Sequence, residues 1–261
     1  MMHFLVPIAT IWQREILRYT RDRIRIATTL IQPLMFLAVF GVGLRQTLAQ
    51  GNFGIDFVQF MYPGIIAMSV MGVAFFSAIS TVWDREFGFL REILVAPVAR
   101  TSIALGKALG ATTVAALQAF ILLLLAPILG IRIDPFSLLE LFSLLLFLAF
   151  AISGIGLLVA SLMKTTESFG LLMQVLVFPM FFLSGAFFPL TKVPLWMLAI
   201  ARLNPLTYGV DALRQIILRP QVAPETLRTV VLYPVAVNAL FLIAFSAVMV
   251  SAAVAVFTKK S

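Results

Sequence analysis

The chain has 261 residues, of which 62% are hydrophobic and only 11% charged, with a net charge of +8 and no cysteine. A mean hydropathy of +1.08 is too high for a soluble domain, whose exterior must stay polar, so the composition indicates an integral membrane protein. The missing cysteines exclude disulfides and thiolate metal sites, and the cationic excess fits anionic lipid headgroups, with no nucleic acid as a partner.

Residues 7–25 are predicted to form an interfacial helix ahead of the first span. Its apolar and aromatic residues share one side, and its arginines follow i, i+4, i+7, i+11 spacing as a separate stripe. Such a helix lies flat in the headgroup region, with aromatic rings toward the acyl chains and arginines at phosphate. An ordinary solvated helix is the alternative. The residues assigned to the membrane interface are Trp12, Arg14, Arg18, Tyr19, Arg21 and Arg25.

Six segments follow that are long enough to cross the hydrocarbon, which takes about 20 apolar residues. They are placed at about 26–44, 58–82, 102–129, 136–163, 168–189 and 230–257. With the N-terminus inside, the inner regions hold twelve Lys and Arg, and the outer regions hold seven, five of which fall within residues 190–229. This distribution predicts one multi-pass domain, residues 1–261, in the bacterial cytoplasmic (inner) membrane with both termini cytoplasmic.

The charged stretch WDREFGFLREILVAPVAR, residues 83–100, separates the second and third spans and predicts a short amphipathic helix over residues 84–96. Asp84 is placed to cap its first turn, and Pro97 ends it. One side of the helix is expected to rest on the spans, and the other to face the cytosol with Arg85, Glu86, Arg91 and Glu92. A surface helix that merely caps the bundle is the alternative.

Residues 181–220 are cut by prolines into pieces of roughly ten to fourteen residues, too short to cross a bilayer. Short apolar pieces of this kind predict re-entrant helices over residues 190–218, before the last span. Asp211 lies three residues from both Tyr208 and Arg214, so an Asp–Arg pair is expected near the outer interface. An external amphipathic loop is the alternative.

Two of these stretches resemble ABC-2 type transporter permeases, notably their antibiotic-resistance and nodulation-factor export branches. DREFGFLREILVAPVAR is similar to the cytoplasmic loop of that family, and SGAFFPL with NPLTYGVDALR is similar to its C-terminal signature. The resemblance implies that helix 84–96 is a coupling helix, seated in a cleft of a nucleotide-binding subunit. The coupling positions are Asp84, Arg85, Glu86, Gly88, Leu90, Arg91, Glu92, Leu94 and Pro97. The signature positions in the re-entrant region are Asn204, Pro205, Tyr208, Asp211 and Arg214.

ATP hydrolysis is expected in a partner chain, because no G-x-x-x-x-G-K-[ST] motif occurs here. The resemblance implies two copies of this permease and two ABC ATPase subunits, which bind the ATP and Mg; this chain is expected to hold no cofactor and to be no enzyme. Gly106 and Gly110 form a small-xxx-small face suited to close helix packing.

The expected function is export of an apolar or amphipathic cargo, namely a drug, a lipid or a lipo-oligosaccharide. An ion-coupled secondary transporter of hydrophobic compounds is the alternative. It is less favoured because it usually needs ionisable groups deep in the membrane, and the predicted spans hold few.

Overall fold

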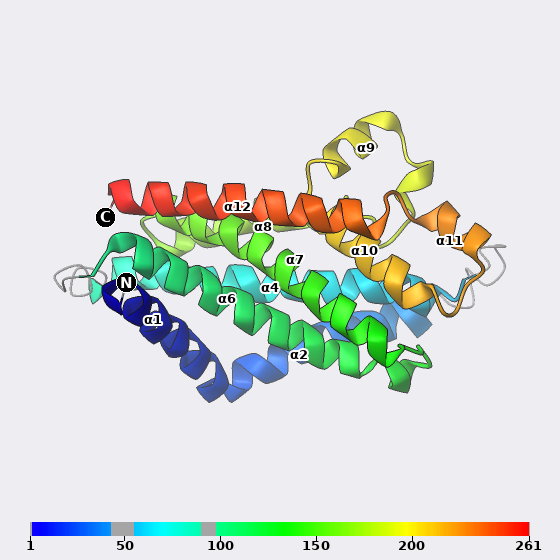
Figure 1. The fold of residues 1–261 in the computed structure, drawn as a ribbon, viewed down its shortest axis with the longest axis horizontal. Coiled ribbons are helices and arrows are strands. Elements are labelled where there is room, and N and C mark those ends of the chain that lie inside the picture. Colours follow the sequence, from blue (N-terminus) through cyan, green and yellow to red (C-terminus); the bar gives the residue numbers. More distant parts are fainter. Residues whose placement is uncertain (1, 43–54, 90–97, 261) are drawn as a thin grey trace.

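The computed structural model of this chain describes residues 2–42, 55–89 and 98–260, and every element in these ranges is helical (Figure 1). The all-α membrane fold expected from the sequence is confirmed. The long helices are α1 (Met2–Arg21), α2 (Arg23–Phe36), α4 (Phe57–Glu86), α6 (Arg100–Leu124), α7 (Pro135–Leu162), α8 (Thr166–Phe182) and α12 (Val235–Lys260). Shorter pieces are η1 (Leu37–Val42), η2 (Ala126–Leu129), η3 (Leu190–Lys192), α9 (Leu195–Ala201), α10 (Pro205–Leu218) and α11 (Pro224–Val230).

Five stretches among the described residues are long and apolar enough to cross a membrane: Arg23–Phe40, Phe57–Glu86, Arg100–Leu124, Pro135–Leu162 and Pro224–Thr258. The predicted C-terminal end of the fifth span, 168–189, is wrong, because α8 ends at Phe182. The Ser184 hydroxyl donates to the Phe181 carbonyl oxygen at 2.6 Å. Gly185 then takes φ +80°, a left-handed conformation that suits glycine, and the chain turns away from the axis of α8. The remaining α8 has 17 residues.

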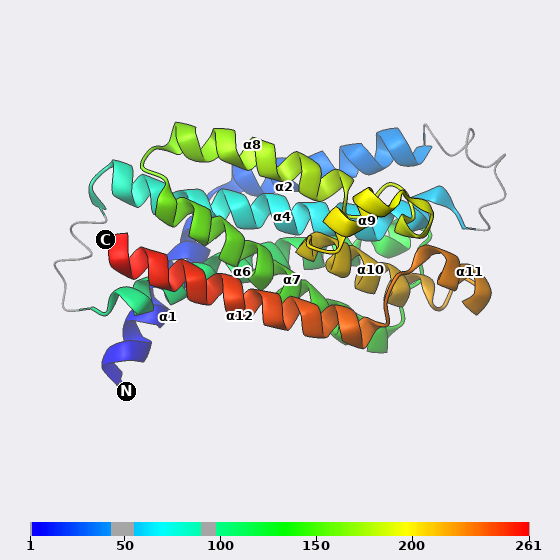
Figure 2. The same ribbon diagram turned by 90° about the horizontal axis from the view of Figure 1, so that it is seen from above.

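The helices α4, α6, α7 and α12 run side by side through the bundle, with α2 and α8 toward one edge (Figures 1 and 2). Both termini lie at the same end, together with the end of α4 and the start of α6. We call this the proximal end. The short helices α9, α10 and α11 lie toward the opposite, distal end. With the shorter α8 counted beside the five spanning stretches, the chain runs between the two ends six times. The residues on either side of the predicted coupling helix therefore lie next to α1.

Small residues allow the central helices to approach closely. A Cβ added at Gly154 of α7 would lie 2.9 Å from the Cβ of Met249 on α12. One added at Gly156 would lie 2.9 Å from the Cβ of Ala78 on α4. Such separations are shorter than side chains tolerate, so the helix backbones pack directly on each other, as expected where lipid offers no hydrophobic driving force between helices.

Candidate functional site at the proximal end

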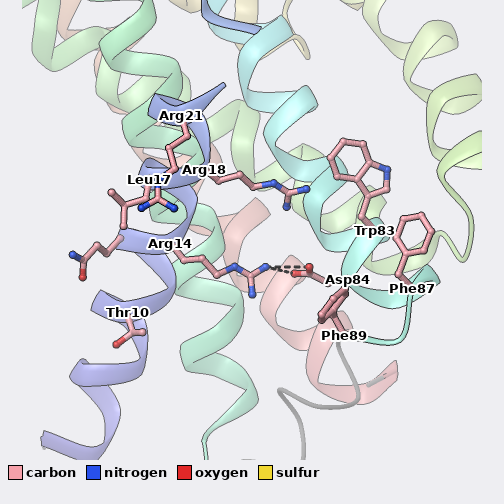
Figure 3. A pocket seen from close by; sticks show the side chains of 10 residues that line it. Thr10, Arg14, Leu17, Arg18, Arg21, Trp83, Asp84, Phe87 and Phe89 are labelled. Carbon is pink, nitrogen blue, oxygen red and sulfur yellow. Dashed lines mark hydrogen bonds and ion pairs between the residues drawn. The ribbon is translucent and has the colours of Figure 1, made fainter. Parts of the chain in front are cut away.

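Asp84 is the centre of a group of charges that joins three helices. It lies in the last turn of α4 and is only 6% exposed. Its Oδ2 atom lies 2.6 Å from Nζ of Lys107 on α6. An Nη atom of Arg14 on α1 donates to both carboxylate oxygens, at 3.0 and 2.8 Å (Figure 3). The carboxylate is therefore fully engaged by cations from two other helices.

Glu15 completes this group, which we call the charge cluster (Arg14, Glu15, Asp84 and Lys107). Its Oε1 atom lies 3.7 Å from Nζ of Lys107 and 3.9 Å from Arg14. Lys107 and both acids are buried, whereas the Arg14 side chain is 41% exposed. Buried charges keep their ionised forms only when they are paired, so each member of the cluster depends on the others.

Two glycines of α6 bring α1 close enough for these pairs to form. A Cβ added at Gly106 would lie 2.8 Å from the Cβ of Ile11, and one added at Gly110 would lie 2.6 Å from the Cβ of Glu15. The close packing predicted for Gly106 and Gly110 is confirmed, and α1 is the helix that they receive. Any larger residue at Gly110 would push Glu15 away from Lys107.

The two residues after Asp84 attach the end of α4 to the turn between α7 and α8. Nη1 of Arg85 donates to the carbonyl oxygens of Ser161 at 3.0 Å and Met163 at 2.7 Å. The Glu86 carboxylate accepts from the Thr166 amide at 2.9 Å and from its hydroxyl. The proximal end of α4 is thus fastened to four other helices through three consecutive charged residues.

The start of the predicted helix 84–96 was wrong. Asp84 does not cap a new helix, because α4 continues without a break through Glu86 and no helix-ending residue occurs before Gly88. Gly88 takes φ +81°, which ends α4, and Phe89 is again helical. Arg85 was expected to face the cytosol but is half-buried against carbonyl groups, whereas Glu86 is exposed as expected. Other predicted coupling positions, Leu90, Arg91, Glu92, Leu94 and Pro97, lie outside the described residues.

The interfacial helix predicted over 7–25 ends at Arg21 in the structure. Asp22 interrupts it and caps α2, its carboxylate accepting from the Arg25 amide at 3.0 Å. Arg25 therefore belongs to α2, where it donates to Ser77 Oγ at 2.9 Å and lies over the Phe76 ring. A polar residue able to accept a bond from the next turn was the signal for this break.

The aromatic residues of α1 pack on α6, contrary to their predicted place among acyl chains. Tyr19 is 6% exposed and its hydroxyl donates to Oε1 of Gln118. Burial raises the pKa of the Tyr19 phenol above its ordinary value. Trp12 is partly exposed, and its Nε1 donates to Thr113 Oγ1 at 3.0 Å. The Tyr19 hydroxyl and the Trp12 indole N–H therefore both bond to α6.

The distal end holds a second polar group. Asp211 of α10 accepts from the amides of Leu232 and Tyr233, at 2.8 and 3.0 Å, and from Asn238 Nδ2 at 2.8 Å. Arg214 donates to the carbonyl oxygens of Gly185 at 2.7 Å and of Phe60 at 3.3 Å. We call Asp211, Arg214 and Asn238 the distal network.

The predicted Asp211–Arg214 pair does not form among the ion pairs of the described residues. The i, i+3 spacing permits it, but Asp211 accepts instead from the amides of residues 232 and 233 and from Asn238, and Arg214 donates to carbonyl oxygens. Asn204 caps α10 by accepting from the Leu206 amide at 3.0 Å, with Pro205 at the first helical position. Tyr208 stacks on Phe241 with ring centroids 3.6 Å apart. Short helices do occupy residues 190–218; a re-entrant place in the bilayer stays a prediction.

Neither end offers metal-binding chemistry within the described ranges, where no group of three His, Cys, Asp or Glu side chains gathers. The arrangement is that of a helical, multi-pass membrane protein with buried ion pairs linking its helices. Residues 7–218 match the ABC-2 type transporter family. The chain therefore belongs to the ABC-2 type transporter family.

Similar proteins carry permease names. The chain is 32% identical to the putative transport permease ycf38 of Cyanophora paradoxa, over 81% of this chain and 74% of that protein. It is 32% identical to the probable multidrug ABC transporter permease YbhR of Escherichia coli K12, over 64% of this chain and 46% of YbhR. Identity to the inner membrane transport permease YadH of the same strain is 27%, over 82% of this chain and 84% of YadH. The protein is thus an inner-membrane permease subunit rather than an ATPase, and its family implies an ABC ATPase as partner.

Proposed function

We propose that this permease exports an apolar or amphipathic cargo, a drug, a lipid or a lipo-oligosaccharide, across the cytoplasmic membrane under the drive of a separate ATPase. ATP and Mg are bound by that partner and not by this chain. The charge cluster is the observation that carries the proposal, because it ties the residues before the coupling segment to α1 and α6. The probable multidrug name of YbhR supports a drug-like cargo.

On this proposal, the ATPase pushes on the C-terminal end of α4. The ATPase docks on the segment that follows Gly88, and Gly88, with φ +81°, is a joint between that segment and α4. Arg85 and Glu86 hold that joint to the α7–α8 turn, so a push displaces α4, α7 and α8 together. Asp84 passes the displacement to α1 and α6 through Arg14 and Lys107. A helix end with paired charges transmits a push better than a free loop does, because its side chains are already ordered.

The assembly contains two copies of this chain and two ATPase subunits, with the proximal end and both termini on the cytoplasmic side. A cytoplasmic proximal end agrees with the larger number of Lys and Arg among its residues. An unpartnered apolar face on α8 supports a second copy, since Leu171, Val175 and Phe178 are each more than 60% exposed there.

Ion-coupled transport is the second candidate, and the charge cluster is also the observation that favours it. Asp84 and Lys107 form a buried acid–base pair of the kind that carries protons in secondary transporters. Asp84 lies in the last turn of α4 and Lys107 in the second turn of α6, so the pair lies toward the proximal end of both helices rather than at their middle, which disfavours a relay across the bilayer.

Reconstitution separates the two functions. The permease is placed in proteoliposomes alone, or with its partner ABC ATPase, and uptake of the dye Hoechst 33342 and of a fluorescent phospholipid is followed. Export predicts transport only when ATPase, ATP and Mg are all present, with stimulation of the ATPase by the permease. Transport by the permease alone under a pH gradient would overturn the proposal.

A further inference from the structure

A wedge-shaped cavity of about 830 Å³ separates α1 from the proximal end of α4 (Figure 3). Arg14, Arg18 and Arg21 line it from α1, and Trp83, Phe87 and Phe89 line it from the other side. Arg14 crosses the wedge to Asp84, and the Arg18 guanidinium lies 4.9 Å from the centre of the Trp83 ring. The volume is within the range of sites that enclose a small molecule.

The electrostatic character of the cavity is strongly cationic. Asp84 is the one acidic residue among the described residues that line the cavity, and that carboxylate already binds Lys107 and Arg14. Arg21 makes no hydrogen bond or ion pair with any of the described residues, and Arg18 is matched only by an aromatic face. Two arginines thus line the cavity without an acidic partner in the part of the chain that the structure describes. Planar guanidinium groups favour phosphate oxygens.

The rest of the lining is apolar and poorly covered. Phe87 is 71% exposed, Phe89 is 58% exposed, and Leu17 is 43% exposed between the arginines. Trp83 lies one turn before the end of a spanning helix, the level at which indole rings meet lipid headgroups. Cations beside aromatic rings at this depth suit a ligand with an anionic head and an apolar tail.

We propose that this cavity binds the headgroup of an anionic phospholipid, with the phosphate between Arg18 and Arg21 and the start of the acyl chains against the aromatic rings. An acidic segment of a protein partner has the charge but not the apolar tail. The outer face of α1 also exposes Leu5 and Val6, at 60% and 57%, which suits a helix lying among lipids. The lipid site is independent of the proposed export function.

Binding is measured on the purified permease alone, in detergent, as quenching of tryptophan fluorescence by phosphatidylglycerol with brominated acyl chains. The difference between the wild type and Trp83→Phe gives the signal of Trp83. Each arginine near an anionic headgroup contributes about fivefold in affinity, so Arg21→Gln should raise the half-saturating lipid concentration about fivefold. Arg18→Gln with Arg21→Gln should raise it about thirtyfold.

Arg23→Gln is the matched control, because Arg23 is exposed on α2, carries the same charge and does not line the cavity. It should leave half-saturation within twofold. Arg21 is exposed and makes no hydrogen bond or ion pair within residues 2–42, 55–89 and 98–260, so Arg21→Gln should fold even if the double variant is unstable. Brominated phosphatidylcholine should quench Trp83 only at far higher concentration.

Four results would each overturn the lipid site. The first is a half-saturating lipid concentration of Arg21→Gln equal to that of the wild type. The second is binding of phosphatidylcholine as tight as that of phosphatidylglycerol. The third is displacement of the lipid by millimolar glycerol 3-phosphate, which would indicate a site for free phosphate. The fourth is displacement of the lipid by an acidic peptide at micromolar concentration, which would assign the cavity to an acidic protein segment. Because the binding assay contains no ATPase, its failure would leave the export proposal untouched.

Discussion

At the proximal end Asp84 is held by cationic side chains from two other helices, whereas at the distal end Asp211 is held by two backbone amides and one neutral amide. Long side chains on separate helices can stay in contact while those helices move against each other. Backbone bonds to a loop allow no such freedom. We infer that the charge cluster suits the transmission of movement, and that the distal network holds the short helices in place.

Asp84→Asn should have the largest effect on stability. It leaves Lys107 buried opposite a neutral amide, and an unpaired buried charge of this kind costs about 3–5 kcal/mol. The midpoint of thermal unfolding of the purified permease should fall accordingly, and ATPase stimulation should be lost. Asp22→Asn is the control, since Asp22 is exposed and asparagine caps a helix equally well. Equal unfolding midpoints of the two variants would contradict a stabilising role of the charge cluster.

Arg214→Ala should come next, with a loss of about 3 kcal/mol, because it removes the buried donor to the carbonyl oxygens of Gly185 and Phe60. Its effect should differ in kind from that of Asp84→Asn. Yield and unfolding midpoint should drop, but the protein that does fold should move the same amount of dye per ATP hydrolysed.

Arg228→Ala is the control for this variant. Arg228 is exposed at the end of α11, so its loss should change stability by no more than about 0.5 kcal/mol. If Arg214→Ala uncoupled the ATPase from transport while leaving stability intact, the distinction between the two ends of the molecule would be lost.

Gly110→Ala sharpens the comparison at the proximal end alone. The new methyl group would meet Glu15 at 2.6 Å, and overpacking of this kind costs about 1–3 kcal/mol while moving α1 off α6. We expect a lowered unfolding midpoint and reduced ATPase stimulation. Gly72→Ala adds the same methyl group on α4 where nothing lies within 4 Å, and it should be neutral or slightly stabilising. Identical behaviour of the two alanine variants would remove the role of close packing.

The fold followed from the sequence wherever a local rule decides the structure. Runs of apolar residues located the spans, and prolines located the short helices at 190–218. The break at Asp22 was overlooked although a capping side chain marked it, and the end of α8 was overlooked although Ser184–Gly185 marked it.

The charge cluster depends on contacts that no local pattern contains. Glu15 and Lys107 meet only because Gly106 and Gly110 admit α1, and the two residues lie about ninety positions apart. A lysine inside an apolar span was the available signal, since an ionisable residue there usually has a partner. The predicted Asp211–Arg214 pair failed for the same reason: its spacing was correct, but amides from residues 232 and 233 compete for the carboxylate.

Glu86→Lys should have the smallest effect on stability and still separate ATP hydrolysis from transport. Glu86 is exposed, so membrane insertion and the unfolding midpoint should match the wild type. The lysine cannot accept the bonds from Thr166, so the end of α4 is freed from the α7–α8 turn just before the Gly88 joint. ATPase activity should continue with little dye movement. Glu86→Gln retains an acceptor oxygen and should keep coupling within about twofold, because a neutral acceptor can still bond to Thr166. Normal transport in Glu86→Lys would show that the attachment of α4 to this turn transmits nothing, and the proximal end would then act through the charge cluster alone.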